Sequence, residues 1–222
     1  MSVGPEGRGG GERARPRCLA FVTGTATEIG KTWWTAAVAR ALDATGSRVA
    51  LRKPVQSCDP DDVTDAEILA AATGDDADAV TPAHRTYRVA WAPPMAADHL
   101  GQPPFRVAEL VEELSWPTGT DIGLVEGVGG PRSPVASDGD NVTMIDLLDP
   151  DVVVLVADAG LGTVNAVRLA AAALTTRPLV VALNRYAEDE LHERNRAVLV
   201  SDGLTVVTTP AELAAMLRRF AR

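Results

Sequence analysis

The stretch GTATEIGKT, residues 24–32, decides how this chain folds and what it binds. It lies between an apolar run at 18–23, which predicts a strand, and a stretch at 31–45, which predicts a helix closed by Gly46. A glycine-rich loop between a strand and a helix wraps phosphates with its backbone N–H groups. Lys31 can then reach the β- and γ-phosphates, and Thr32 can ligate Mg²⁺.

The spacing of the first glycine departs from the strict phosphate-loop pattern. That pattern places a glycine five residues before Gly30, where this chain has Thr25, and the first glycine comes one residue earlier, at Gly24. The Gly-Lys-Thr triplet at a helix start still favours phosphate binding. The competing interpretation is a helix that carries this triplet by coincidence.

Strand and helix patterns alternate along the rest of the chain. Alternation of this kind implies an α/β fold with a doubly wound and mostly parallel sheet and helices on both faces. Together with the phosphate loop it predicts the P-loop NTPase type. Ligand sites are then expected at the carboxyl ends of the strands. An irregular, proline-rich connection at 81–104 is long enough to suggest a functional loop. The further predicted strands are 48–51, 122–125, 152–156, 179–183 and 204–207, and the further predicted helices are 65–72, 107–114, 164–174 and 210–220.

Composition limits the architecture and the partners. The chain has 222 residues, with 46% hydrophobic and only 4% aromatic residues, so we expect one domain over 18–222 with a core of Ala, Val and Leu. Residues 1–17, rich in Gly and Arg, are predicted to be a disordered N-terminal extension and not a signal peptide. A net charge of −9 argues against nucleic acid and anionic membranes as partners.

The two cysteines, Cys18 and Cys58, have no disulfide or metal-ligand spacing, which predicts a reducing, cytoplasmic compartment. No apolar run is long enough for a membrane span. The three histidines, His84, His99 and His192, are also far apart, and we expect none of them to bind a metal. His84 and His99 are predicted in loops, and His192 on a solvated helix face.

A second lysine follows the second predicted strand, in the segment KPVQS at 53–57. A second cation facing the γ-phosphate would stabilise charge on the transferring group, which gives Lys53 a role. The hydroxyl of Ser57 follows in the same loop. The alternative is a solvated lysine at a strand end.

Acidic residues stand at two further loops. Glu126 begins the segment EGVGG at 126–130 after a predicted strand, where glycines let the backbone approach a ligand while the carboxylate faces a metal. A simple glycine turn is the alternative. Asp65 opens a helix after an acidic cluster, and it is open whether it is only a favourable acid at a helix start or whether Asp61 or Asp62 takes its place at the site.

Taken in order, these motifs resemble the dethiobiotin synthetase family over residues 19–207. The phosphate loop matches the family pattern G-T-x-T-x-x-G-K-T, and residues 53–57 match K-P-V-x-[ST]. EGVGG resembles E-G-A-G-G, with Val128 in the place of Ala, and LGTVN at 161–165 resembles L-G-x-x-N. The resemblance implies an ATP-dependent ligase that closes the ureido ring of dethiobiotin on 7,8-diaminononanoate with CO₂, releasing ADP and phosphate.

The resemblance also implies a role for individual residues. One amine of the diamine forms a carbamate, ATP phosphorylates it, and the other amine closes the ring. Asn165 is placed at the interface of a homodimer, where it helps receive substrate, and Asn184 offers its amide to adenine. For these two residues a plain helix entry and a strand-ending turn remain the alternatives.

The expected partners are ATP, CO₂ or bicarbonate and a small diamine, with Mg²⁺ as cofactor. The residues expected at the reacting centre are Lys53, Lys31 and Thr27; those expected to bind ATP are Glu28, Ile29, Gly30, Lys31, Thr32, Trp33, Asp65, Glu126, Gly127, Val128, Gly129, Asn184, Arg185, Thr208, Thr209 and Pro210; those expected to bind substrate are Thr27, Ser57 and Asn165; and those expected to hold the metal are Thr32, Asp65 and Glu126.

Other functions are open to a chain with this loop. One is a related P-loop ligase acting on another amine or acid, although a cobyrinate-type enzyme would need a glutaminase domain for which the chain has no room. Another is a ParA-like or MinD-like switch ATPase, which would carry a second lysine early in the loop, where Ala26 and Thr27 stand. A third is a nucleotide-binding module without catalysis.

Overall fold

The computed structural model describes residues 15–221. The predicted N-terminal extension therefore lies mostly outside the described residues. Its last residues are placed, and the backbone N–H of Arg17 donates to the carbonyl of Thr120 at 3.3 Å. Within 15–221, no helix has both the length and the apolar character that crossing a membrane requires.

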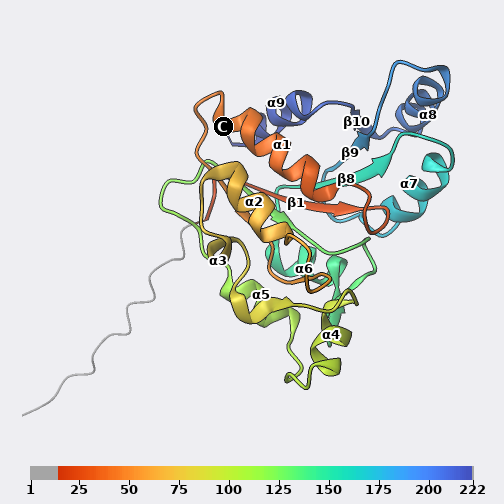
Figure 1. Cartoon of the computed structure of the whole chain (residues 1–222). Coiled ribbons are helices and arrows are strands. Elements are labelled where there is room, and N and C mark those ends of the chain that lie inside the picture. The colour runs from red at the N-terminus through yellow and green to blue at the C-terminus, as the bar shows by residue number, and fades with distance from the viewer. Residues whose placement is uncertain (1–14, 222) are drawn as a thin grey trace, which may run out of the picture.

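A six-stranded sheet forms the centre of the molecule, with the order β10-β9-β8-β1-β5-β2 (Figure 1). Each neighbouring pair in this sheet is parallel. This confirms the predicted α/β class and the parallel sheet. The strands are β1 (Cys18–Gly24), β2 (Val49–Arg52), β5 (Ile122–Glu126), β8 (Val152–Asp158), β9 (Leu179–Asn184) and β10 (Thr205–Val207).

Side chains of the strands alternate between two hydrophobic clusters, one on each face of the sheet. In β1, Ala20 and Val22 belong to one cluster, and Leu19 and Phe21 belong to the other. Successive side chains of a strand point to opposite faces, so a strand that is apolar throughout its length must be covered on both sides. The sequence of β1, buried at every position, therefore requires a layer of helices on each face.

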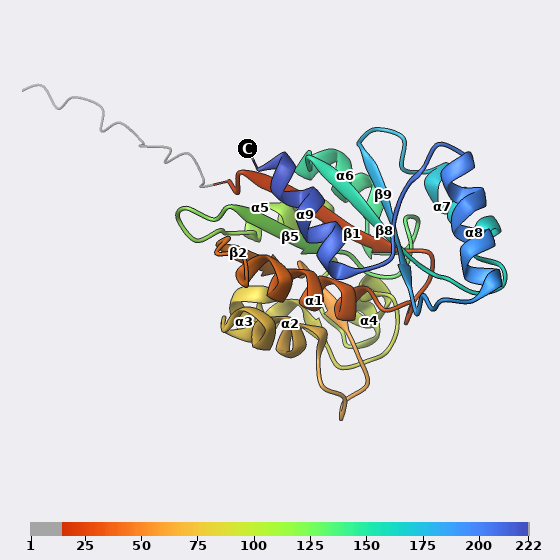
Figure 2. The same cartoon turned by 90° about the horizontal axis from the view of Figure 1, so that it is seen from above.

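Helices provide these two layers, and Figure 2 shows α1 beside α9 on one of them. The cluster on this face contains residues of α1 (Lys31–Asp43), α2 (Asp65–Thr73), α3 (Ala77–Val80) and α9 (Pro210–Phe220). The cluster on the opposite face contains residues of α4 (Pro93–His99), α5 (Val107–Glu113), α6 (Asn141–Leu148), α7 (Thr163–Ala171) and α8 (Glu190–Ser201).

The chain reverses its direction of travel across the sheet at β1. It passes from β1 to the edge strand β2, returns to β5, and then continues on the other side of β1 through β8, β9 and β10. Crevices at such a switch point, beyond the carboxyl ends of the strands, are where open α/β sheets bind ligands. The loop at 24–30 leaves β1 at this point.

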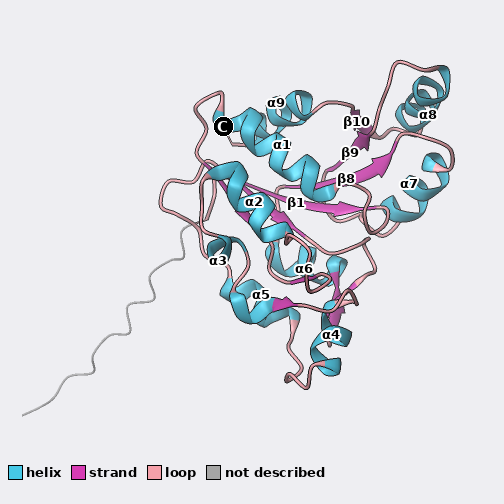
Figure 3. Cartoon of the chain, in the orientation of Figure 1, coloured by secondary structure: helices cyan, strands magenta, loops and turns pink. Residues whose placement is uncertain are grey.

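The connection at 81–104 is more ordered than its prolines indicate, so the prediction of an irregular segment is wrong in part. It contains a short 3₁₀ helix, η1 (Ala83–Arg85), strand β4 (Thr86–Tyr87) and helix α4, which Figure 3 shows in the lower part of the molecule. Pro93 and Pro94 occupy the first two positions of α4. The backbone N–H groups at a helix start have no partner within the helix, so proline is tolerated there.

Two small strand pairs lie outside the main sheet. β3 (Gln56–Ser57) pairs in parallel with β4, and β6 (Pro134–Ala136) pairs antiparallel with β7 (Gly139–Asp140). The first pair anchors the loop after β2 to the 81–104 connection. Ser57 lies in β3 and Lys53 lies three residues before it, so this pairing helps to position both predicted site residues.

Candidate active site

The loop between β1 and α1 explains why its first glycine stands at 24 and not at 25. A Cβ atom at Gly24 would lie 2.6 Å from a side-chain carbon of Ile29, so only glycine fits there. Thr25 has room for its side chain and donates its backbone N–H to Val156 at 2.9 Å. Gly30 has φ +97°, a conformation that favours glycine, and begins α1.

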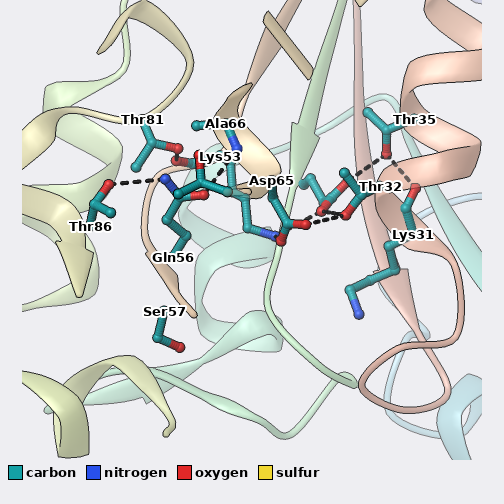
Figure 4. Close-up of polar contacts among 12 residues, drawn as sticks. Lys31, Thr32, Thr35, Lys53, Gln56, Ser57, Asp65, Ala66, Thr81 and Thr86 are labelled. Atoms are coloured by element: carbon teal, nitrogen blue, oxygen red, sulfur yellow. Dashed lines mark hydrogen bonds and ion pairs between the residues drawn. The ribbon is translucent and has the colours of Figure 1, made fainter. Parts of the chain in front are cut away.

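Four side chains, from three elements and the loop after β2, converge beside this loop, and Figure 4 labels three of them, Thr32, Lys53 and Asp65. Thr32 lies at the start of α1, Lys53 follows β2, Asp65 opens α2 and Glu126 ends β5. The hydroxyl of Thr32 lies 2.9 Å from Asp65 Oδ1 and 2.9 Å from Glu126 Oε1. The Lys53 ammonium lies 2.5 Å from Asp65 Oδ2 and 2.7 Å from Glu126 Oε1. We call these residues the acidic-lysine cluster.

Two members of the acidic-lysine cluster are buried. Glu126 is 0% exposed and Lys53 is 3% exposed. Burial is the largest influence on the pKa of Lys53 and acts to lower it, but attraction to Glu126 and Asp65 and hydrogen bonds with both outweigh burial, so this pKa is raised. A buried charge is tolerated only when it is paired, which makes the lysine and the carboxylates depend on each other. Lys53 is therefore not a solvated lysine at a strand end.

Asp65 is the aspartate that contacts Lys53 and Thr32, whereas Asp62 lines the same cavity. Burial would raise its pKa, but attraction to Lys53 and hydrogen bonds from Lys53 and Thr32 lower it. A capping box formed by Thr64 and Glu67 holds the start of α2. The side-chain oxygen of Gln56 accepts the backbone N–H of Ala66 at 3.0 Å and fixes the same turn to the loop after β2.

Lys31 is buried at 7% exposure and stands apart from the acidic-lysine cluster. Its ammonium donates to the carbonyl of Ala26 at 3.3 Å, and Figure 4 shows it directed away from Asp65. Burial lowers its pKa, and repulsion by Lys53 lowers it further, against attraction to Glu126 and Asp65. An anion held by the loop would offset this cost.

Thr32, Asp65 and Glu126 present a set of donors suited to Mg²⁺. The hydroxyl oxygen of Thr32 lies within hydrogen-bond distance of one oxygen of each carboxylate, and hard oxygen ligands are those that Mg²⁺ prefers. Within residues 15–221, no group of three or more His, Cys, Asp or Glu side chains has the geometry of a metal site. The candidate magnesium site therefore consists of two carboxylates and a hydroxyl, of which Thr32 and Asp65 line the adjoining cavity.

A cavity of about 540 Å³ opens beside the acidic-lysine cluster. The hydroxyl of Ser57 lies at its edge and donates to the carbonyl of Trp91 at 2.5 Å. The residues that line this cavity include Thr27, Glu28, Gly30, Lys31, Thr32, Lys53, Ser57, Asp59, Asp62, Asp65, Trp91, Val128 and Gly129. The cavity therefore joins the phosphate loop to the loop after β2.

The glycine loop after Glu126 is held by Asn141, a residue that the sequence analysis missed. Its side-chain amide donates to the carbonyls of Val128 and Gly130, both at 2.6 Å. A Cβ atom at Gly127 would lie 2.2 Å from the Asn141 side-chain oxygen, so this close approach needs glycine. The carbonyl of Gly129 also accepts the backbone N–H of Gly24 at 3.2 Å, which ties the two glycine loops together.

A second cavity of about 460 Å³ lies at the other end of the phosphate loop. Trp33, 57% exposed, forms part of its wall. The remaining lining residues are Gly30, Trp34, Leu183, Asn184, Arg185, Tyr186 and Thr208. These include five of the residues expected to bind ATP, namely Gly30, Trp33, Asn184, Arg185 and Thr208.

Thr209 and Pro210 were also expected to bind ATP, but they lie at the start of α9. Thr209 caps α9 and forms a capping box with Glu212, and Pro210 is the first residue of that helix. Neither residue lines the two cavities. They position Thr208, whose backbone N–H donates to the Glu212 carboxylate at 2.8 Å.

Asn165 is not brought to either cavity. It is exposed in the first turn of α7 and lines neither of them.

His192 differs from its prediction on a solvated face, because its side chain is only 16% exposed and its Nδ1 accepts the backbone N–H of Ala187 at 3.0 Å. His99, predicted in a loop, is the last residue of α4 and lies against Trp91, and His84 lies in η1.

Thr35 is a further residue that the sequence analysis missed. Its hydroxyl donates to Glu126 Oε2 at 2.7 Å and lies 2.9 Å from the Lys31 carbonyl. The signal was available, because a residue four positions after Lys31 lies on the same face of the helix. Both oxygens of the Glu126 carboxylate are therefore held by residues of α1.

Comparison with known proteins agrees with this geometry. Residues 20–213 match the model of a family described as AAA domain. The chain is 42% identical to an ATP-dependent dethiobiotin synthetase of Streptomyces avermitilis, over 72% of this chain and 67% of that protein. It is 34% identical to an ATP-dependent dethiobiotin synthetase of Haloferax mediterranei, over 85% of this chain and 82% of that protein.

Solved structures share the fold at low identity. A DUF1611 family protein from Anabaena variabilis is similar with a TM-score of 0.53 and 18% identity, over 92% of this chain and 57% of that one. The signal recognition particle receptor FtsY of Elizabethkingia anophelis, in complex with GDP, is similar with a TM-score of 0.50 and 15% identity, over 95% of this chain and 66% of that one. The fold rests on these likenesses and the family on the curated relatives: this chain belongs to the ATP-dependent dethiobiotin synthetase family of P-loop enzymes.

Proposed function

We propose that this chain closes a ureido ring on 7,8-diaminononanoate with CO₂ and ATP, giving dethiobiotin, ADP and phosphate. The observation that carries the proposal is the acidic-lysine cluster, in which Lys53 lies within 2.7 Å of both Asp65 and Glu126 beside the phosphate loop. Membership of the family supplies the substrate, and the cluster supplies groups for phosphoryl transfer.

The reaction has three bond-forming steps. One amine of the diamine bonds to the carbon of CO₂ and loses a proton, giving a carbamate. A carbamate oxygen then takes the γ-phosphoryl group of ATP, and ADP leaves. The second amine attacks the activated carbon and loses a proton, phosphate leaves, and the ring closes. Negative charge accumulates on phosphate and carbamate oxygens during these steps, so cations beside them accelerate the reaction.

Lys31 and Lys53 are the cations that we assign to this charge. Both are buried, so their interaction with an anion in the cavity is screened little by water. Lys31 would bind the phosphates of ATP from the loop. Lys53, at the junction of the loop and the cavity, would face the transferring group and the carbamate oxygen.

Mg²⁺ is the cofactor that Thr32, Asp65 and Glu126 suit. Their oxygens would hold the ion, which, when bound, would offset charge on the β- and γ-phosphates of ATP. The hydroxyls of Thr27 and Ser57 line the same cavity and would hold the substrate by hydrogen bonds. Residues 18–222 would act as one ligase domain, since the two hydrophobic clusters cover opposite faces of one sheet.

The nucleotide base would occupy the second cavity. Trp33 offers an aromatic face there, and Asn184 and Thr208 offer polar groups. The protein would work in the cytoplasm as a homodimer, with Asn165 of one copy meeting the substrate of the other. Asn165 is exposed and follows Leu161, an apolar residue that is 94% exposed, by four positions. Two exposed residues this close in sequence support a role for this segment at the dimer interface.

The test is the release of ADP by the purified chain with Mg-ATP. We expect ADP at an appreciable rate only when both diaminononanoate and bicarbonate are present, because phosphoryl transfer needs the carbamate. ADP released equally well with either one omitted would instead identify a switch ATPase. No ADP under any of these conditions would leave a nucleotide-binding module as the function.

A further inference from the structure

Trp34 donates a hydrogen bond to Asn184, a residue that lines the second cavity, which we call the base cavity. The residue lies in α1 next to Trp33 and is only 1% exposed. Its indole N–H donates to the side-chain oxygen of Asn184 at 3.2 Å, across 150 residues of sequence. A buried indole N–H needs an acceptor, and here that acceptor is the amide at the end of β9.

The other end of the Asn184 amide is held as well. Its nitrogen donates to the carbonyl of Ile29 in the phosphate loop at 2.9 Å. A side-chain amide has two N–H donors and two acceptor lone pairs. The protein uses one of each, so one donor and one acceptor remain for a ligand in the cavity that Asn184 lines.

The Asn184 amide packs closely against the phosphate loop. A Cβ atom at Gly30 would lie 2.2 Å from the amide nitrogen of Asn184, so the amide rests directly on the backbone of the loop. The indole of Trp34 holds the oxygen end, and Ile29 holds the nitrogen end. With both contacts present, exchange of oxygen and nitrogen by rotation of the amide is disfavoured.

We propose that Trp34 is a positioning residue that fixes the orientation of the Asn184 amide and thereby makes the base cavity select adenine over guanine. The inference rests on the proposed function in one respect, which is that the second cavity holds the nucleotide base. Adenine presents an acceptor, N7, beside a donor, its amino group, whereas guanine presents two acceptors, N7 and O6. A fixed amide with one donor and one acceptor complements adenine, and its oxygen repels O6 of guanine.

The experiment is calorimetry of Mg-ATP and Mg-GTP binding to the full chain, without diamine. Trp34→Phe keeps an aromatic ring and removes the N–H, and we expect it to weaken ATP binding by about fivefold, the effect of one hydrogen bond, and to weaken GTP binding less. Asn184→Ala should weaken ATP binding at least as much. The double variant should match Asn184→Ala, because Trp34 acts through Asn184.

Trp116→Phe is the matched control. Trp116 packs over Arg52 and lines neither cavity, so this variant should keep the affinities of the unchanged chain. Three results would overturn the proposal: equal losses for ATP and GTP in Trp34→Phe, additive losses in the double variant, or no loss at all. The first two would indicate a general distortion of α1.

A second variant covers the case in which Trp34→Phe does not fold. Asn184→Asp keeps an acceptor for the Trp34 indole but replaces the donor to Ile29 with a second acceptor, so we expect it to lose the preference for ATP. An unchanged ratio of ATP to GTP affinity in a folded Asn184→Asp variant would contradict the proposal. Because these measurements contain no diamine, a failure of the ligase reaction itself would be seen separately, in the ADP assay.

Discussion

The ammonium of Lys53 lies 2.7 Å from an oxygen of Glu126, and the Glu126 side chain is 0% exposed. Two opposite charges buried this deeply cost much free energy unless each satisfies the other. The pair therefore connects the ends of β2 and β5 electrostatically, at the point where the phosphate loop ends. This relationship underlies the predictions for the reacting centre.

Lys53→Gln should lower kcat far more than it weakens ATP binding. The cation matters most when the γ-phosphoryl group moves, so its loss should reduce kcat by about 10²- to 10³-fold, while the dissociation constant of ATP changes by less than about threefold. Steady-state kinetics and calorimetry measure the two effects. Arg40→Gln, at an exposed position of α1, is the control and should change neither. A near-normal kcat for Lys53→Gln would remove Lys53 from the reacting centre.

Glu126→Gln should raise the Mg²⁺ concentration needed for half-maximal ADP formation. Removal of one carboxylate charge from the set of oxygen ligands should lower the affinity for Mg²⁺ by about tenfold or more. A Mg²⁺ titration at saturating ATP measures this. Asp61→Asn is the matched control, since Asp61 neither joins the acidic-lysine cluster nor lines the cavity. The same Mg²⁺ requirement in both variants would argue against the proposed ligands.

Asp65→Asn should show a pH-dependent loss of stability. Burial acts to raise the pKa of Asp65, but attraction to Lys53 and the hydrogen bonds from Lys53 and Thr32 together lower it from its ordinary value of 3.8. Its ionised form therefore stabilises the fold above that ordinary value, and this contribution is lost as the pH falls through the lowered pKa. Urea unfolding should show a larger difference between the unchanged chain and Asp65→Asn at about pH 7 than at about pH 3. A difference that is independent of pH would contradict the pairing with Lys53.

Gly30→Ala and Gly46→Ala form a matched pair at two helix ends. Both glycines have positive φ, +97° and +78°, but a Cβ at Gly46 meets nothing within 4 Å, whereas one at Gly30 would strike Asn184. Gly46→Ala should cost about 1–2 kcal/mol of stability from backbone strain and keep ATP affinity. Gly30→Ala should also lose ATP affinity, by about tenfold or more, because Asn184 is displaced. Equal ATP affinities would contradict the assigned fit.

Local patterns along the sequence predicted the main sheet, because its strands are continuous apolar runs and its helices begin with recognisable signals. Lys53, Asp65 and Glu126 were predicted from the family motifs together with their positions after a strand or at a helix start. Parallel topology brings such positions together, so a motif order along the chain becomes a cluster in space. In the structure the Lys53 ammonium lies 2.5 Å from an oxygen of Asp65 and 2.7 Å from an oxygen of Glu126.

Contacts between distant segments could not be predicted in the same way. The bonds from Asn141 to the glycine loop and from Trp34 to Asn184 join residues with no shared motif. Helix α4 was missed because its first residues are Pro93 and Pro94, which were interpreted as signs of irregular structure. Asn165, exposed on α7, was predicted from the family pattern, and the role proposed for it needs a second copy of the chain.

The most direct test of the central claim is mass spectrometry of the reaction product. Purified protein is incubated with Mg-ATP, diaminononanoate and ¹³C-bicarbonate, and Lys53→Gln is treated in parallel. We predict a product with the mass of dethiobiotin, heavier by the isotopic label, and much less of it with Lys53→Gln. ADP without any labelled ureido product from the unchanged chain would contradict the account.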